Sequence, residues 1–192
     1  MNKTKSNTVY MTYVALMVAI ATILSYFPEI PLVFFAPHLK LDFSFVPMLL
    51  IGFSFGPGAS IMALLISNFI RLLSTNTAGV GQLANILVGA AYLLPPTIMY
   101  QKNRSKKTAF LGCCFGVVLQ IVMAMITNKY LLIPVFLGEK IATFDMTNYL
   151  LTGVLPFNIV KGVVNTLITF LLYKHLSVYI KKMSKEKNQS KC

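Results

Sequence analysis

The sequence predicts an all-α integral membrane protein with six transmembrane helices. Of its 192 residues, 56% are hydrophobic and only 11% are charged. A soluble domain usually carries about a quarter charged residues, so much of this surface must face something other than water. Apolar runs recur through most of the chain, as in proteins that cross lipid several times. Such segments must be helices or closed barrels, and the alternating pattern of barrel strands is absent.

The predicted helices span residues 9–27, 43–55, 59–73, 83–101, 109–127 and 148–173. The first could be a removed signal peptide, because Ala19-Ile20-Ala21 has the form of a cleavage site. The apolar run continues to Phe27, however, and five more segments follow, which favours a first transmembrane helix. The second segment would form a helix of only about 20 Å. Gly56-Pro57-Gly58 predicts a tight turn after it, so the second and third segments should form a hairpin that either borrows loop residues or does not cross fully.

Residues 1–192 are predicted to form one domain, because six spans leave little chain for loops, with short basic tails at 1–8 and 184–192. Twelve of the 17 Lys and Arg residues lie in the N-terminal tail, in the loop after the fourth segment and in the C-terminal end from Lys174 onward. Four lie on the other side, and Lys161 lies within a span. By the positive-inside rule, both termini are predicted to be cytoplasmic. The same distribution argues against nucleic acid as a partner, since no solvated basic face is formed.

The sequence lacks the residues and motifs of several functional classes. No Asp or Glu lies deep in a span, unlike in many ion-coupled carriers, and there is no P-loop for ATP. If the chain transports a solute, another subunit should therefore supply the energy. His38 and His175 lie on opposite sides, and no G-x-S-x-G motif occurs, so no enzyme activity is predicted. Cys113 and Cys114 are adjacent and point in different directions, so neither a metal site nor a cofactor is predicted.

Lys161 is the most informative single residue, because a charge within a span costs a few kcal/mol or more. Asn158, Lys161 and Asn165 are spaced i, i+3, i+7 and share one helix face, which must turn to the bundle interior. Intramembrane ionisable residues usually have a function, so a ligand role is favoured. The alternative is a lysine that reaches the interface or pairs structurally with an acid such as Asp42.

Other polar residues gather toward the predicted external ends of the helices. Lys40 and Asp42 flank Leu41 before the second segment, and on their own they would be ordinary interface charges. Three amide side chains also lie on this side, and each alone could be a cap or an interhelical bond. These are Gln82, Asn85 and Asn128. Because polar residues from four parts of the chain converge, we predict one pocket open to the medium, where amides would suit the edge of a heteroaromatic ring.

Ala15 and Ala19 form a small-xxx-small pattern on the first segment. Such a face lets helices approach closely. The spacing leaves open whether it packs within this chain or against a partner subunit.

Four segments resemble the S components of energy-coupling factor (ECF) vitamin transporters, and most closely those specific for riboflavin. The order and spacing of these segments match over nearly the whole chain. They are Leu39-Lys-Leu-Asp-Phe-Ser-Phe-Val-Pro47, Gly81-Gln-Leu-Ala-Asn85, Asn128-Lys-Tyr-Leu-Leu-Ile-Pro134 and Leu155-Pro-Phe-Asn-Ile-Val-Lys-Gly162.

The resemblance implies a six-helix S-component bundle in the bacterial cytoplasmic membrane that binds riboflavin on the external side. It also implies a transmembrane T component and two ATPase subunits as partners, which drive uptake by tipping the loaded protein. Ala15 and Ala19 match the alanine motif that contacts the T component. The motif positions that meet the flavin are matched by Lys40, Leu41, Asp42, Asn128, Asn158 and Lys161.

Two residues depart from the family pattern. Phe45 stands where an acidic residue is common, and Lys129 alters the usual Asn-Tyr neighbourhood. The ligand could therefore be riboflavin, an analogue or FMN. The rival functions are an S component for another vitamin, a small membrane enzyme, or a structural subunit without a small ligand.

Overall fold

The computed structural model describes residues 3–26, 30–31, 40–74, 79–138 and 144–189. Its helices are α1 (Lys3–Tyr26), α2 (Phe45–Phe55), α3 (Pro57–Leu72), α4 (Val80–Lys102), α5 (Lys106–Thr127), α6 (Ile133–Leu137), α7 (Met146–Tyr149) and α8 (Leu155–Gln189). Two π-helical turns, η1 (Asn128–Leu132) and η3 (Leu150–Val154), make α5 continuous with α6 and α7 continuous with α8. The described residues thus form six helical segments, and the predicted all-α class is confirmed.

The only strands among the described residues are β1 (Ile30–Pro31) and β2 (Lys40–Leu41). They pair antiparallel, with Ile30 opposite Leu41. This short ribbon brings the chain back to the start of α2.

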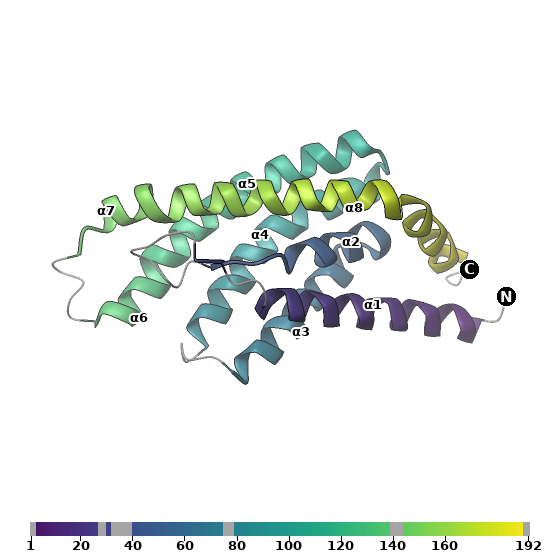
Figure 1. The fold of residues 1–192 in the computed structure, drawn as a ribbon. Helices are drawn as coiled ribbons and strands as arrows, with labels where there is room; N and C mark the ends of the chain where they lie inside the picture. Colours follow the sequence, from purple (N-terminus) through teal and green to yellow (C-terminus); the bar gives the residue numbers. More distant parts are fainter. Residues whose placement is uncertain (1–2, 27–29, 32–39, 75–78, 139–143, 190–192) are drawn as a thin grey trace.

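Three of the six segments are long and apolar enough to cross a membrane: Val80–Lys102, Lys106–Leu137 and Met146–Tyr173. The others are shorter apolar helices at Tyr10–Tyr26, Phe45–Phe55 and Pro57–Leu72. The start of α1 and the end of α8 lie at one end of the bundle, whereas α6 and α7 lie at the other (Figure 1).

The predicted tails are partly helical. The α1 helix already begins at Lys3, and α8 continues to Gln189, well into the predicted tail at 184–192. Lys, Glu and Gln are good helix formers, so a helix can continue in water beyond its apolar part. The charge pattern therefore indicates where an apolar span ends, but not where the helix ends.

The α2 helix is the centre of the bundle, which explains its short length. Every residue from Phe45 to Phe55 is buried, and α2 contacts α1, α3, α4 and α8. The predicted hairpin with α3 is confirmed: Gly56 turns the chain with a φ of 96°, a value that favours glycine, and Pro57 begins α3. Gln101 Nε2 donates to the carbonyl oxygens of Gly52 and Phe53 at 3.2 Å, which satisfies the end of α2.

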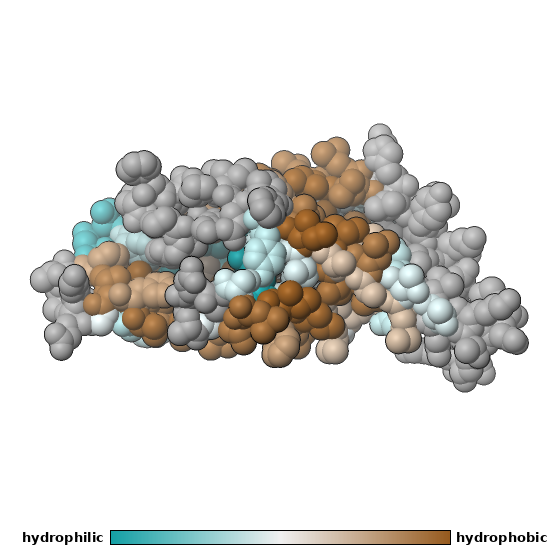
Figure 2. All heavy atoms as spheres, turned by 60° about the horizontal axis from the view of Figure 1, so that its bottom comes forward, coloured by the Kyte–Doolittle hydropathy of each residue, from teal (hydrophilic) through white to brown (hydrophobic). Residues whose placement is uncertain are grey.

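The face of the bundle drawn in Figure 2 carries wide apolar areas. Large hydrophobic side chains are exposed on several helices, such as Phe69 (68%), Leu111 (60%) and Leu171 (65%). A water-soluble monomer rarely exposes contiguous apolar surface of this kind. Together with the apolar helices, this surface is that of a multi-pass membrane protein.

Candidate functional site

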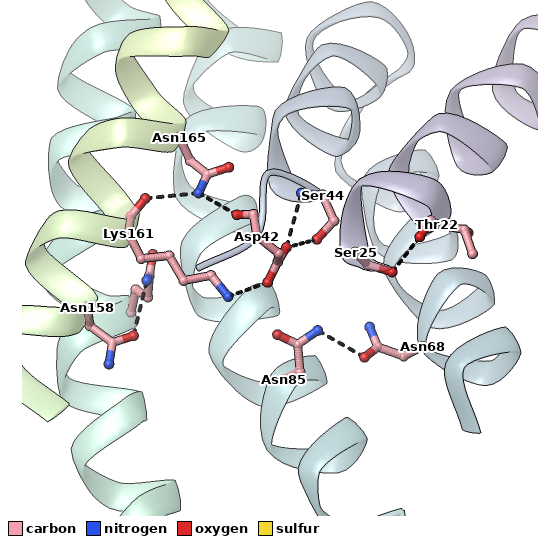
Figure 3. A network of polar contacts seen from close by, with 10 residues as sticks. Thr22, Ser25, Asp42, Ser44, Asn68, Asn85, Asn158, Lys161 and Asn165 are labelled. Atoms are coloured by element: carbon pink, nitrogen blue, oxygen red, sulfur yellow. Dashed lines mark hydrogen bonds and ion pairs between the residues drawn. The ribbon is translucent and has the colours of Figure 1, made fainter. Parts of the chain in front are cut away.

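The site is built around a buried ion pair between α8 and the segment before α2. Lys161 Nζ lies 2.8 Å from Asp42 Oδ2 (Figure 3). Lys161 is 6% exposed and Asp42 is 5% exposed, although 119 positions separate them in the chain. Because an unpaired buried charge is costly, each residue needs the other in order to be buried.

Asp42 is held on several sides. Its Oδ1 atom accepts hydrogen bonds from the Ser44 amide, at 3.0 Å, and from the Ser44 hydroxyl. Its main-chain oxygen accepts from Asn165 Nδ2 at 3.1 Å. An ammonium, an amide and a hydroxyl around one carboxylate favour its ionised form. The acid is therefore fixed in place as a counter-ion for Lys161.

Phe45 covers the other side of the ammonium. Lys161 Nζ lies 4.7 Å from the centre of the Phe45 ring, a distance at which a cation is attracted to an aromatic face. The residue that departs from the family pattern thus contributes an apolar wall and not a second acid.

Asn158 and Asn128 are two further buried amides whose hydrogen bonds fix their orientation. Asn158 Nδ2 donates to Val154 O at 2.9 Å, and its Oδ1 atom accepts from Gln120 Nε2 of α5 at 3.2 Å. Asn128 Nδ2 donates to Ala124 O at 2.8 Å, and its Oδ1 atom accepts from the Tyr149 hydroxyl at 2.8 Å. Both amides are 3% exposed.

Each of these amides stands beside a π-helical turn. Asn128 begins η1, and Asn158 lies one turn of helix after η3. Single π-helical turns are frequent at functional sites, since they rotate the side chains that follow.

Leu41 is buried in an apolar cluster. Its other members include Val88, Tyr149, Val154 and Phe157. Lys40 belongs to β2, but its side chain lies outside the described residues. Leu41, Asp42, Asn158 and Lys161 thus lie near the start of α2. Asn128 is linked to them through Tyr149, which belongs to the same cluster as Leu41.

The remaining two predicted residues belong to the start of α4. Asn85 Nδ2 donates to Asn68 Oδ1 of α3 at 2.9 Å, and Asn68 is 2% exposed (Figure 3). Asn85 therefore forms the interhelical bond that the sequence left as an alternative. Gln82 is half-buried in the first turn of α4.

A cavity of about 410 Å³ opens between α6 and α7. It is lined by Ile133, Phe136, Leu137, Phe144, Asp145, Asn148 and Tyr149. Its size is within the range of small-molecule sites. Tyr149 connects it to the polar region, because the hydroxyl of this residue bonds Asn128.

Known proteins resemble this chain in both sequence and fold. Residues 9–173 match the family model of the ECF transporter, substrate-specific component. The chain belongs to this family. Its fold is similar to a solved structure described as the S component of a bacterial ECF transporter, with a TM-score of 0.78 and 33% identity, over 91% of this chain and 99% of that one.

Curated relatives of this S component are named riboflavin transporters. Riboflavin transporter RibU of Staphylococcus aureus is 35% identical over 88% of this chain and 91% of its own length. Riboflavin transporter FmnP of Bacillus subtilis is 29% identical, over 80% of this chain and 82% of its own length. RibU of Streptococcus thermophilus is 28% identical, over 93% and 87%.

The alanine motif of the S component lies on an outward face of α1. Ala15 and Ala19 are both exposed, next to Met11 (66% exposed), Leu16 (56%) and Ile23 (62%). The two alanines are therefore not used for close packing within this chain. Of the two alternatives left by the spacing, packing within this chain is therefore not used, and docking on a partner stays a prediction.

The sequence analysis of the S component missed three residues of the site. Gln120 is 0% exposed and bonds Asn158, Ser44 bonds Asp42, and Tyr149 bonds Asn128. Gln120 could have been found because it is a glutamine within an apolar run. Ser44 could have been found because it follows Asp42 by two positions, a spacing at which an Asp side chain often bonds the backbone. Nothing local distinguishes Tyr149 from the other tyrosines.

Proposed function

We propose that this S component binds riboflavin with high affinity on the external side of the bacterial cytoplasmic membrane. The vitamin would then be taken up by means of ATP hydrolysed in partner subunits. The names of the curated relatives support this cargo. The observation that carries the proposal is the buried Lys161–Asp42 pair. It is accompanied by two amides with fixed orientation, Asn158 on α8 and Asn128 at the end of α5.

The chemistry of a flavin suits these groups. Its pyrimidine edge carries carbonyl oxygens and an N–H, so it needs both donors and acceptors. An ammonium donates up to three hydrogen bonds, and Asp42 accepts one of those from Lys161. Each Asn side chain keeps one N–H and one lone pair beyond the bonds described above. Lys161, Asn158 and Asn128 would bind the ring edge, while Leu41 and Phe45 would cover its face.

The remaining predicted residues would lie around these groups in this proposal. Lys40, Gln82 and Asn85 would contact the ligand from the segment before α2 and from the start of α4. Asp42 would fix the ammonium. The chain would act as one domain without catalytic activity, and it would need no bound cofactor or metal of its own.

We also infer the orientation and the partners. The start of α1 and the end of α8 lie at one end of the bundle (Figure 1). Together with the loop after α4, the two ends of the sequence carry 12 of the 17 Lys and Arg residues, so the termini would be cytoplasmic. The site lies toward α6 and α7, which would place it on the external side. Ala15 and Ala19 would dock on the transmembrane T component, which in turn would associate with two ATPase subunits.

The test is an absorption spectrum of the full chain purified in detergent, followed by a riboflavin titration with fluorescence quenching. A flavin spectrum, or saturable quenching at one site per chain, is expected. Competition with FMN then separates a neutral flavin from a dianionic one. A colourless protein that ignores both flavins would overturn the cargo, and thiamine, folate and biotin would be tested next.

A further inference from the structure

Four buried asparagines share one local arrangement. In each, Nδ2 donates to the carbonyl oxygen four residues earlier in the same helix. They are Asn68 (to Leu64), Asn128 (to Ala124), Asn158 (to Val154) and Asn165 (to Lys161). This bond turns the amide along the helix and leaves its oxygen to face a neighbour.

In three of the four, that oxygen is taken by a donor from another part of the chain. Asn68 accepts from Asn85, Asn128 from Tyr149 and Asn158 from Gln120. Asn165 is the exception. It is 0% exposed, and its Oδ1 atom has no hydrogen-bond partner among the described residues.

The donor atom of Asn165 therefore determines its orientation. Its Nδ2 atom contacts two main-chain oxygens, that of Lys161 at 2.9 Å and that of Asp42 at 3.1 Å. These oxygens belong to the two partners of the buried ion pair (Figure 3). One amide group thus joins α8 to a residue 123 positions earlier, at the point where the chain enters α2.

We propose that Asn165 is a positioning residue of the ligand site, and this inference rests on the proposed function. Asn165 lies one turn beyond Lys161 on α8 and does not need to touch the ligand. It holds the Asp42 main chain, while Lys161 and Ser44 hold the Asp42 carboxylate. With both ends of Asp42 fixed, the Lys161 ammonium has one position in which it can meet a ligand.

Without Asn165, the carboxylate could still follow the ammonium, but the pair would no longer have a fixed place. Ligand binding would then have to supply the ordering that the apoprotein now provides. The expected signature is a loss of affinity together with altered hydrogen bonding to the bound flavin ring.

The test uses two variants of similar size that lack the Nδ2 donor, Asn165→Leu and Asn165→Asp. The control is Thr169→Val, one turn further along α8. Thr169 is also 0% exposed, and its hydroxyl donates only to the Asn165 main-chain oxygen, at 2.7 Å. Each full chain is purified in detergent and checked by size exclusion, and its riboflavin Kd and bound-flavin absorption spectrum are measured.

We expect both Asn165 variants to bind riboflavin about tenfold more weakly than wild type, which corresponds to about 1.4 kcal/mol. Their flavin absorption bands should also shift, because the band positions respond to hydrogen bonds at the ring. Thr169→Val should retain the wild-type Kd and spectrum. If Asn165→Leu does not fold, the test of the positioning role uses Asn165→Asp alone.

Two results would overturn the positioning role. One is an Asn165 variant whose Kd stays within about twofold of wild type. The other is weaker binding with an unchanged flavin spectrum and an equal loss in Thr169→Val, which would mean a general effect on α8. If wild type itself binds no flavin, the proposed function fails instead, so the two failures are distinguishable.

Discussion

The side chains of Lys161 and Asp42 meet at 2.8 Å in the interior of the bundle, and each residue is more than nine-tenths buried. The Phe45 ring faces the same ammonium at 4.7 Å. This places a lysine from the middle of a predicted span beside an acid that the sequence assigns to a loop. The free-energy cost of burying one charge is offset by the opposite charge beside it, so a polar site can exist inside an apolar bundle.

Variants of the Lys161–Asp42 pair should affect the stability of the fold and the binding of riboflavin differently. Lys161→Met leaves Asp42 buried without its partner and should lower the free energy of unfolding by about 3–5 kcal/mol. Adding Asp42→Leu should restore most of that loss, because an apolar pair of similar volume replaces the charges. Riboflavin binding should remain absent in the double variant. Thermal unfolding and flavin titration in detergent measure the two effects, and wild-type affinity in the double variant would contradict a ligand role for Lys161.

Gln120 should control binding through Asn158. Gln120→Leu removes the donor at 3.2 Å that fixes the Asn158 oxygen, so this amide can rotate. Loss of one such hydrogen bond, about 0.5–1.5 kcal/mol, should weaken riboflavin binding by about 2- to 12-fold. Thr127→Val is the matched control on α5, because among the described residues the Thr127 hydroxyl bonds only carbonyl oxygens of its own helix. Equal Kd values for Gln120→Leu and wild type would refute the prediction.

The close contact between α4 and α5 should tolerate no side chain at Gly116. A Cβ atom there would lie 2.5 Å from the Tyr92 carbonyl oxygen. Gly116→Ala should therefore lower the free energy of unfolding by about 1–3 kcal/mol. Gly58→Ala in α3 is the control, since its Cβ would meet nothing within 4 Å and alanine favours a helix. The two variants should change the thermal midpoint in opposite directions.

The alanine face of α1 should matter for assembly and not for ligand binding. The double variant Ala15→Leu with Ala19→Leu adds bulk to an exposed face, so the unfolding temperature and riboflavin Kd should be unchanged. Co-purification with the T component and the ATPase subunits should be lost. Val118→Leu, which enlarges an exposed side chain on α5, should co-purify normally. Retention of the complex by the alanine variant would place the docking surface elsewhere.

The orientation can be tested with single cysteines in a chain whose own cysteines are replaced. Thr147→Cys lies in α7 and Asn103→Cys follows α4, and both positions are exposed. A maleimide that does not cross membranes should label intact cells at position 147 and not at position 103. The reverse labelling would place the termini outside.

The sequence was sufficient for the existence and order of the helices. Apolar runs identified all six segments, and Gly56 with Pro57 correctly placed the hairpin between α2 and α3. The boundaries were less accurate. The π-helical turns η1 and η3 extend two helices, and such turns depend on packing that hydropathy does not contain.

For the site, periodicity correctly put Asn158, Lys161 and Asn165 on one interior face, because a polar stripe in lipid must turn inward. From the sequence, an ion pair between Lys161 and Asp42 was only the alternative to a ligand role for Lys161. The structure has the two together, and a ligand role for Lys161 stays a prediction.

By itself, the sequence determined that this protein lies in a membrane as a helical bundle with a polar stripe on its last helix. These properties follow from composition and helical period, which are local. The tertiary structure alone decided that the stripe meets Asp42, that Gln120 and Tyr149 fix the two amides, and that Ala15 and Ala19 face outward. Those contacts join positions distant along the chain, and only the packing of α2 and α5 against α8 brings them within hydrogen-bond distance.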